Sequence, residues 1–289
     1  MTRNHVSAEP NGTARPHPLK KARSPNRQAE SLPHFPALAR LGGERRLKSA
    51  FALKLERYER FSGYLPKSVS SLMTRKRTFE PGMQLSYHGE PGGVAFIIED
   101  GWTFSSKLMP GGARQILDIQ IPGDVAGLQN LPVPFADHDV TALTKVIVHE
   151  VRFSDLANAI SSDPGLAGLI LWLAASDSAV ASERLIDIGQ RSALERMAHF
   201  ILELATRLRL AGLSTHAGFP CPMTQYVLGD ALGLTSVHVN RVLRDLRTAR
   251  LAHHRRGWIS LLDIGMLSEV ARFDAAYLDH TSVLDTARN

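Results

Sequence analysis

The sequence predicts an α+β protein in which an antiparallel β domain is followed by a long helix and by a helical C-terminal domain with a small hairpin. Three observations support this order. Residues 72–151 hold short apolar runs separated by turn residues, residues 153–189 have the spacing of a long helix, and residues 190–289 hold several shorter helical segments. With 289 residues, the chain is long enough for two domains that each have a core.

The basic character of the chain is concentrated at its start. The net charge is +6, but residues 1–48 hold ten Lys or Arg against three acidic residues, so residues 49–289 come to −1. Residues 1–34 also hold Pro10, Pro16, Pro18, Pro25 and Pro33. Such a segment buries too little apolar surface to offset the entropy lost on ordering, and we expect a disordered basic tail there.

Cysteine content and apolar runs bear on the compartment. The single cysteine excludes an intrachain disulfide and fits a reducing environment. No uninterrupted apolar run reaches the ~18 residues of a membrane span, and no signal-peptide core follows the basic start. The expectation is a cytoplasmic protein with no membrane partner.

Residues 35–152 form the expected β domain, whose strands follow a helix over residues 38–65. Turn signals at residues 79–82, 99–101 and 110–112 punctuate this region. The apolar runs between and after them are residues 94–98, 102–108, 114–121 and 140–151. Short, evenly spaced strands of this kind predict a β-sandwich or barrel.

Residues 153–189 predict a short helix and then a long one, opened by Asp163 as cap and Pro164 in the first turn. Small residues interrupt its apolar stripe and would let two helices approach closely. We therefore expect a dimer seam that contains Leu169, Leu173 and Val180. The alternative is that the stripe only covers the β domain of its own chain. Gly189 is the expected joint to a C-terminal domain over residues 190–289, whose first helix covers residues 192–210.

Residues 222–260 carry the most specific pattern. An apolar helix over residues 226–232 is followed by Gly233, which can turn the chain through positive φ, and by Thr235, whose hydroxyl can cap a second helix. The inner side of that second helix holds Val239, Val242, Leu243 and Leu246. Its outer side holds Ser236, His238, Arg241, Arg244 and Asp245. Two short helices joined by such a turn, the second cationic outside, predict a helix-turn-helix.

The residues after the second helix predict the winged form of this motif. Residues 251–252 and 258–261 have the composition of two strands, with residues 253–257 as the turn between them. Arg255 and Arg256 then lie at the wing tip, where a phosphate would pass. Residues 220–262 hold six arginines, no lysine and two acidic residues, a local charge of +4. The alternative is a buried helical hairpin with a solvated arginine face.

The stretch LGLTSVHVNRVLRDLR resembles the DNA-binding helices of the Crp/Fnr superfamily of bacterial transcription regulators, and the resemblance covers about residues 50–280. FEPGMQLSYHGE and IIEDGW resemble the first half of a cyclic-nucleotide-binding domain. The resemblance implies an N-terminal antiparallel β jelly roll, a long dimerisation helix and a C-terminal winged helix-turn-helix. It also implies a homodimer that binds an inverted repeat in double-stranded DNA, with RNA polymerase as a further partner.

The resemblance also assigns the residues that would contact DNA. Family members often place a Glu early in the recognition helix, on a cytosine amine, and an Arg one turn later, on guanine. This chain keeps the Arg as Arg241 but has Val237 at the Glu position, and valine can only pack, for instance on a thymine methyl. The expected base-reading residues are Ser236, Val237, His238, Asn240 and Arg241. The expected phosphate contacts are Thr235, Arg244, Arg255 and Arg256.

The effector cassette departs from the family pattern. Members that bind cyclic AMP hold its phosphate with a Gly-Glu pair and an Arg-Ser or Arg-Thr pair, but His138 and Asp139 stand where the second pair would align. An aspartate repels a phosphate, so we expect no tight cyclic AMP binding. A cyclic-nucleotide-responsive regulator remains the alternative. The candidate effector pocket consists of Gly123, Asp124, Gly127, His138 and Asp139.

The sequence offers no pattern for catalysis or for a cofactor. An iron–sulfur cluster needs four thiolates and only Cys221 exists. His88, His138 or His149 could ligate a haem, although each has the setting of an ordinary surface histidine. A cupin-type metal enzyme, the least favoured alternative, would need a His-x-His pair, and residues 72–151 contain none. We therefore expect no enzyme, no catalytic residue, no metal and no cofactor.

Overall fold

The computed structural model describes residues 49–279, which all lie in one compact unit of the chain. The expected basic tail and the first part of the helix expected over residues 38–65 lie outside the described residues. The elements up to the second long helix are α1 (Ala50–Ser62), α2 (Val69–Leu72), β1 (Lys76–Phe79), β2 (Gln84–Ser86), β3 (Val94–Asp100), β4 (Thr103–Leu108), β5 (Arg114–Gln120), β6 (Val125–Ala126), η1 (Leu128–Asn130), β7 (Asp139–Ala142), β8 (Val146–Arg152), α3 (Phe153–Ser162) and α4 (Gly165–Gln190).

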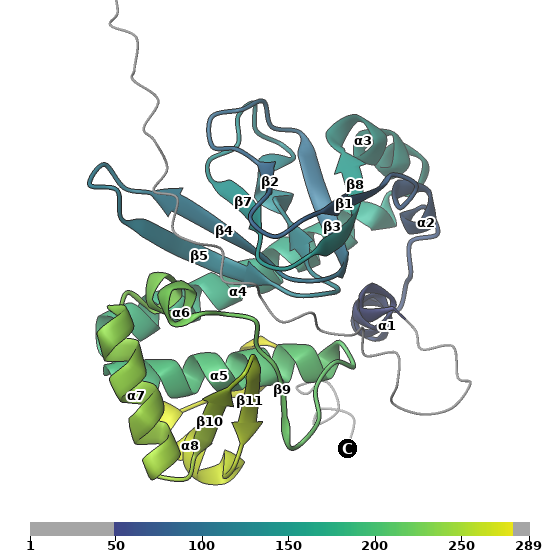
Figure 1. Cartoon of the computed structure of the whole chain (residues 1–289). Helices are drawn as coiled ribbons and strands as arrows, with labels where there is room; N and C mark the ends of the chain where they lie inside the picture. Colours follow the sequence, from purple (N-terminus) through teal and green to yellow (C-terminus); the bar gives the residue numbers. More distant parts are fainter. Residues whose placement is uncertain (1–48, 280–289) are drawn as a thin grey trace, which may run out of the picture. The chain divides into compact units, whose positions relative to one another are not determined.

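The remaining elements form the C-terminal part of the chain (Figure 1). They are α5 (Ala193–Leu210), β9 (Gly218–Pro220), α6 (Gln225–Leu232), α7 (Ser236–Thr248), β10 (Ala252–Arg255), β11 (Trp258–Leu261), α8 (Ile264–Ala271) and η2 (Ala275–Tyr277). The expected α+β fold class is confirmed, with antiparallel sheets first, the long helix α4 next and a helix-turn-helix with a small sheet last.

Two four-stranded antiparallel sheets build the β domain, with strand orders β1-β8-β3-β6 and β2-β7-β4-β5. Alternation along β3 shows how the layers form. Phe96 and Ile98 point into the core between the sheets, with Val140, Val146 and Val148 among their neighbours. Successive side chains of a strand point to opposite faces, so Ala95 and Ile97 reach the other side of β3 and pack with helices α1 to α4. One strand thereby contributes to two cores.

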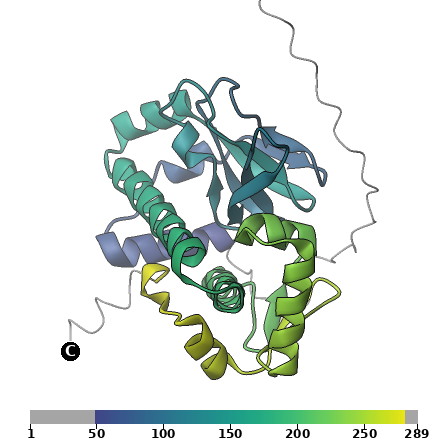
Figure 2. The same ribbon diagram turned by 90° about the vertical axis from the view of Figure 1, so that its left-hand side faces the viewer.

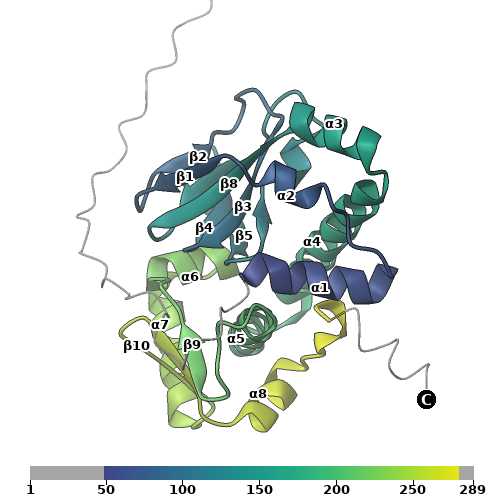
Figure 3. The ribbon, with the colours of Figure 1, turned by 90° about the vertical axis from the view of Figure 1, so that its right-hand side faces the viewer.

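The second sheet is covered by the C-terminal part of the chain. Phe104 on β4 pairs with Ile119 on β5, and both belong to one core that also contains Met197 and Phe200 of α5 and Leu228 of α6. Figure 2 shows the end of α4 leading into α5, and in Figure 3 α1 crosses next to α5, which is seen end-on. The sheet and the C-terminal helices therefore share a hydrophobic core.

Several element boundaries differ from the sequence prediction. The run over residues 140–151 forms two strands, β7 and β8, because the chain leaves the sheet between Ala142 and Val146. After the wing the chain forms two separate elements, α8 and η2, since Arg272 takes the left-handed conformation (φ 48°) and ends α8. The short strands β1, β2, β6 and β9 were not predicted.

Asp163 does not cap α4 as expected. Its carboxylate accepts hydrogen bonds from the Tyr64 hydroxyl (2.8 Å) and from the backbone and hydroxyl of Ser68 (3.2 and 3.0 Å), and Pro164 occupies the N-cap position. The carboxylate therefore ties the start of α4 to the segment between α1 and α2. The helix continues through Gly189 and ends at Gln190, one residue later than the expected joint.

Candidate DNA-binding surface

Helices α6 and α7 are joined by a turn whose residues are set by local sterics. Thr224 caps α6 by accepting from the Val227 N–H, and Gly233 ends it at φ 65°. A Cβ at Gly229 would lie 2.5 Å from the Leu234 carbonyl oxygen, so α6 must carry glycine where the chain turns back. Thr235 caps α7, accepting a 3.2 Å bond from the His238 N–H. The cap at Thr235 and the turn at Gly233 are as the sequence predicted; the requirement at Gly229 was missed.

The two faces of α7 differ as an amphipathic helix requires. Val239, Val242 and Leu246 are fully buried in the core shared with α5, and Leu243 is partly buried against it. On the opposite face Val237 is 78% exposed, and Asn240, Arg241 and Arg244 are exposed as well. Ser236 and His238 are half-buried on the first turn.

Two side-chain pairs order the outer face of α7. The Asn240 amide donates to Oε1 of Gln225 on α6 (2.8 Å), and Nη2 of Arg241 lies 2.9 Å from Nε2 of His238. The cross-helix Gln225–Asn240 bond was not foreseen, since nothing in a single sequence signals which α6 residue faces α7. Tyr226 beside it is 62% exposed.

The wing is a hairpin with a tighter turn than expected. Strands β10 and β11 pair from Ala252–Leu261 to Arg255–Trp258, so residues 253–255 lie in a strand and not in the turn. Arg256 (φ 50°) and Gly257 (φ 73°) form the two-residue connection, and positive φ at both positions matches the twist of a hairpin. Both Arg255 and Arg256 are exposed at this end of the hairpin.

A third strand, β9, pairs with β11 and fixes the wing to the core. A Cβ at Gly218 would lie 2.0 Å from the Ile259 carbonyl oxygen, so this close pairing needs glycine. Cys221 follows β9 and is fully buried, and burial raises the pKa of its thiol to about 12. The thiol is thus held neutral in the core and is not a reactive group.

Known proteins share this arrangement. Residues 195–270 match the family model of the Crp-like helix-turn-helix domain. The nitrogen fixation regulation protein FixK of Bradyrhizobium diazoefficiens is 32% identical over 165 residues, which cover 57% of this chain and 68% of that protein. The chain belongs to the Crp/Fnr family of transcription regulators.

Further relatives agree with this assignment. Electron transport regulator A of Shewanella oneidensis is 27% identical over 195 residues, covering 68% of this chain and 78% of that protein. The solved structure of FixK2 from Bradyrhizobium japonicum covers 69% of this chain and 98% of its own, with 27% identity and a TM-score of 0.63. The chain is thus a DNA-binding transcription regulator of the Crp/Fnr type and not an enzyme.

The three residues expected in the dimer seam are not all exposed on α4. Leu169 and Leu173 are buried in the core that α4 shares with α1 and β3, so their side chains are not available to a partner. Val180 is half-buried. The physical reason is that α4 has two apolar faces, and the stripe chosen from the sequence is the one that covers the β domain of the same chain.

The other face of α4 is apolar and uncovered. Leu171 and Leu185 are 71% and 72% exposed, and Ser178 lies midway between them. Around them α4 exposes small side chains, namely Ala174, Ala175, Ala181 and Ser182.

Within residues 49–279, α4 is the one helix that is long and apolar enough to cross a membrane. This finding concerns length and composition only, and 28% of the apolar window of α4 is buried in the structure.

The candidate effector residues do not form one site. Gly123 and Asp124 line a small cavity of about 60 Å³ beside α1, α4 and α5. His138 is buried elsewhere, between Gln129 and Asp137, while Asp139 accepts from the His88 backbone N–H (2.8 Å). Gly127, in the left-handed conformation, is the N-cap of η1. A small apolar pocket of about 30 Å³ is lined by side chains that include Leu128, Leu131, Val151, Leu169 and Leu173.

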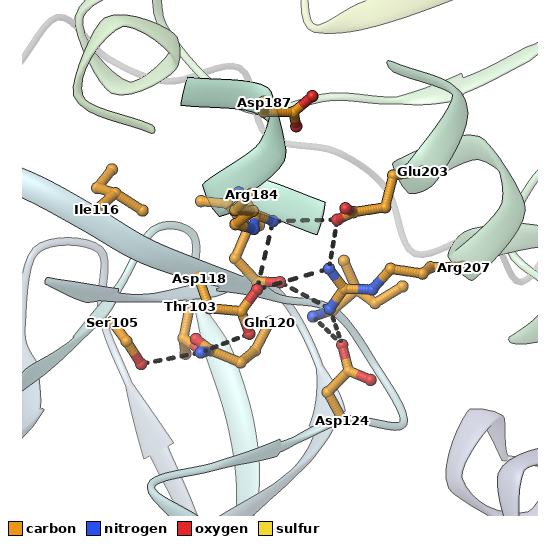
Figure 4. A network of polar contacts seen from close by, with 12 residues as sticks. Thr103, Ser105, Ile116, Asp118, Gln120, Asp124, Arg184, Asp187, Glu203 and Arg207 are labelled. Atoms are coloured by element: carbon orange, nitrogen blue, oxygen red, sulfur yellow. Dashed lines mark hydrogen bonds and ion pairs between the residues drawn. The ribbon is translucent and has the colours of Figure 1, made fainter. Parts of the chain in front are cut away.

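A buried polar network links the β domain to the DNA-binding helices (Figure 4). Arg207 of α5 lies 2.7 Å from Asp124 and 3.2 Å from Glu203, and it donates to the Ile119 carbonyl (2.9 Å). Arg184 of α4 lies 3.0 Å from Glu203 and 3.4 Å from Asp118. Burial raises the pKa of Asp118, although Arg207 and Arg184 act against it. Nothing in the sequence pattern signalled this network.

A second contact reaches α6 directly. Nε and Nη2 of Arg114, on β5, lie 2.9 and 2.7 Å from one Asp230 carboxylate oxygen, and Gln115 donates to the Asp230 carbonyl (3.0 Å). Arg114 also stacks over the Phe104 ring, with its guanidinium carbon 4.8 Å from the centroid. The first helix of the helix-turn-helix is thereby bound to the β sheet.

Proposed function

We propose that this regulator binds an inverted-repeat operator as a homodimer and reads bases with the first turns of α7. The observation that carries the proposal is the division of α7 into an inner face buried on α5 and an exposed face with Val237, Asn240 and Arg241. A helix held in this way can enter a major groove without losing its own packing.

The exposed side chains suggest different roles. Arg241 can make the bidentate contact to guanine, and exposed Val237 can pack on a thymine methyl. Ser236, His238 and Asn240 are the other groups near the base edges. Thr235 at the helix N-terminus and the exposed Arg244, Arg255 and Arg256 would contact phosphates, which position the protein without specifying sequence.

The uncovered face of α4 supports the homodimer. Leu171, Ser178 and Leu185 recur every seven residues, the repeat of a helix that packs on a second helix, with small side chains between them. A second copy of α4 would cover this face and give the protein a two-fold axis. A two-fold protein reads a two-fold site, so half-sites should lie about one helical turn, ~34 Å, apart. A cytoplasmic regulator of this kind would act with RNA polymerase.

We further propose that the β domain does not respond to cyclic AMP. The residues that stand for the phosphate-binding pair, His138 and Asp139, have separate hydrogen-bond partners, and the pocket beside α4 is small and lined only by apolar side chains, which offer a phosphate no donor. Relatives are named as anaerobic and electron transport regulators, but the one thiol of this chain cannot hold an iron–sulfur cluster. Calorimetry with cyclic AMP tests the first statement, and micromolar affinity would contradict it.

The DNA-reading assignment is tested with two variants and an operator library. Arg241→Ala should relax the preference at one symmetric base-pair position, which corresponds to a loss of ~1–3 kcal/mol of discrimination. Arg255→Ala should instead weaken binding to every sequence and reduce the salt slope by about one unit. If Arg241→Ala lowered all affinities equally and left base preferences intact, α7 would not be the reading helix.

A further inference from the structure

His238 and Arg241 form a pair on the DNA-facing side of α7. Nη2 of Arg241 lies 2.9 Å from Nε2 of His238, which precedes it by one helical turn. The backbone N–H of His238 donates to the Thr235 hydroxyl that caps the helix. The histidine therefore stands on an ordered first turn, and its ring is within reach of the guanidinium that would read guanine.

Hydrogen-bonding chemistry fixes the state of this pair. A guanidinium has only donors, so Nε2 of His238 must be the acceptor and its proton must sit on Nδ1. An imidazolium has two donors and no acceptor. Protonation of His238 would therefore break the bond to Arg241 and place a second positive charge beside it.

The surroundings offer no carboxylate in hydrogen-bond contact with His238 among residues 49–279. On the elements packed against α7, Asp230 of α6 binds Arg114 and Arg196 of α5 binds the Leu232 carbonyl. The other titratable side chains of α7 and of these elements, none of them hydrogen-bonded to His238, are Arg244, Asp245, Arg247, Tyr226, Glu195, His199, Glu203, Arg207, Arg209, His253, His254 and Arg255. Arg241 is thus the side chain to which the His238 ring is hydrogen-bonded.

The residue before the histidine explains why such support is needed. Val237 is 78% exposed and has no polar atom in its side chain, so it cannot hold the guanidinium of Arg241. Without a partner the long arginine side chain would lose rotamer freedom on binding guanine. A preformed bond to His238 removes part of that loss before DNA arrives.

We propose that His238 is a positioning residue for Arg241 and that protonation of His238 lowers the discrimination of Arg241 for guanine. The inference rests on the proposed function, because it assigns a regulator to the contact proposed for Arg241. Acidification then changes two quantities in opposite directions. Discrimination for guanine falls because Arg241 is released, while affinity for any DNA rises because the groove-facing surface gains a positive charge.

The experiment measures binding of the full chain to an operator and to the same operator with the guanine replaced, at about pH 7.5 and pH 5.5, on either side of the ordinary histidine pKa. The wild type should discriminate by roughly 10-fold at the higher pH and several-fold less at the lower. His238→Gln keeps an acceptor that does not titrate, so whatever discrimination this variant has at the higher pH should be the same at the lower pH. His253→Gln on β10 removes another titratable side chain and should behave as the wild type.

The outcomes separate the role of His238 from the base-reading role of Arg241. Equal wild-type discrimination at the two pH values, or a fall in His238→Gln as large as in the wild type, would overturn the role of His238. Arg241→Ala at the higher pH separates this from the proposed function. If that variant keeps the guanine preference, the reading assignment itself fails, whatever the histidine does. If it loses the preference, a negative result belongs to His238 alone.

Discussion

At the scale of single residues, Asp124 shows how the chain keeps a charge in its interior. Its carboxylate lies 2.6 Å from Nζ of Lys54 and 2.7 Å from Nη2 of Arg207, and it accepts from the Ile121 N–H (3.0 Å). Burial alone would raise the pKa of Asp124, but Lys54 and Arg207 outweigh burial and hold the pKa below its ordinary value. The folded state therefore favours the ionised carboxylate.

This shift makes stability depend on pH. Because the pKa is lower in the folded than in the unfolded state, the carboxylate stabilises the fold above about pH 4, and that stabilisation is lost as the pH falls toward the folded-state value. Asp124→Asn should lower the free energy of unfolding at neutral pH by roughly 1–3 kcal/mol. It should also flatten the acid decline. Urea unfolding at several pH values measures both, with Asp155→Asn, an exposed pair with Arg75, as the control that changes little.

A second residue-scale prediction concerns Val237, whose side chain is 78% exposed on the reading face. Val237→Glu adds an acceptor that can take a hydrogen bond from a cytosine amine and removes the apolar contact available to a thymine methyl. We expect the preferred base at that operator position to change, by about 1–3 kcal/mol in favour of cytosine. Selection from a randomised operator measures the change. An unchanged preference would mean that Val237 does not reach the base edges.

What the sequence could predict at this scale depended on distance along the chain. The cap at Thr235, the turn at Gly233 and the exposed Arg241 follow from residues within a few positions of one another, and all three were predicted. The bond between Arg114 and Asp230 joins residues more than a hundred positions apart. Periodicity and capping rules carry no information about such a pair.

At the scale of elements, α4 shows why the residues expected in the dimer seam lie on its covered face. A helix with apolar residues on two faces gives two stripes, and one sequence does not say which one the β domain covers. The structure buries the stripe of Leu169 and Leu173 and exposes that of Leu171 and Leu185. The wing turn was predicted too long for a similar reason, since His253 and His254 are compatible with a strand or a loop.

The exposed stripe gives an element-scale prediction. Leu171→Asp together with Leu185→Asp should convert the proposed dimer into monomers, because a second α4 would have to bury two carboxylates without partners. The helical circular dichroism should stay unchanged, as both side chains are exposed in the chain itself. Sedimentation measures the result.

Leu173→Ala is the matched comparison for the dimer experiment. It should lower the free energy of unfolding by about 2–5 kcal/mol, because it opens a cavity in the core of its own chain, and it should leave the dimer intact. A dimer that survives both aspartate substitutions, or one that is lost on Leu173→Ala without loss of stability, would contradict the assignment of the two faces.

At the scale of the whole molecule, the β domain and the DNA-binding helices are not independent. Phe104 and Ile119 of the sheet belong to the same buried core as Phe200 of α5 and Val239 of α7. The fold class could be predicted because each domain has its own local sequence pattern. The contact between the two domains could not be predicted, since the apolar face of a sheet or of a helix has the same sequence pattern whatever element covers it.

This shared core leads to a last prediction, on the cooperativity of unfolding. Residues 49–279 should unfold in one transition, because separating the domains would expose the core and break the buried ion pair between Arg207 of α5 and Asp124 of the β domain. Removing one partner from a buried charge network costs about 3–5 kcal/mol, so Arg207→Ala should lower the unfolding temperature strongly. Arg209→Ala, on the exposed side of the same helix, should change the free energy by less than about 0.5 kcal/mol. Calorimetry of both variants is the measurement, and two separate transitions in the wild type would show that the domains do not depend on this contact.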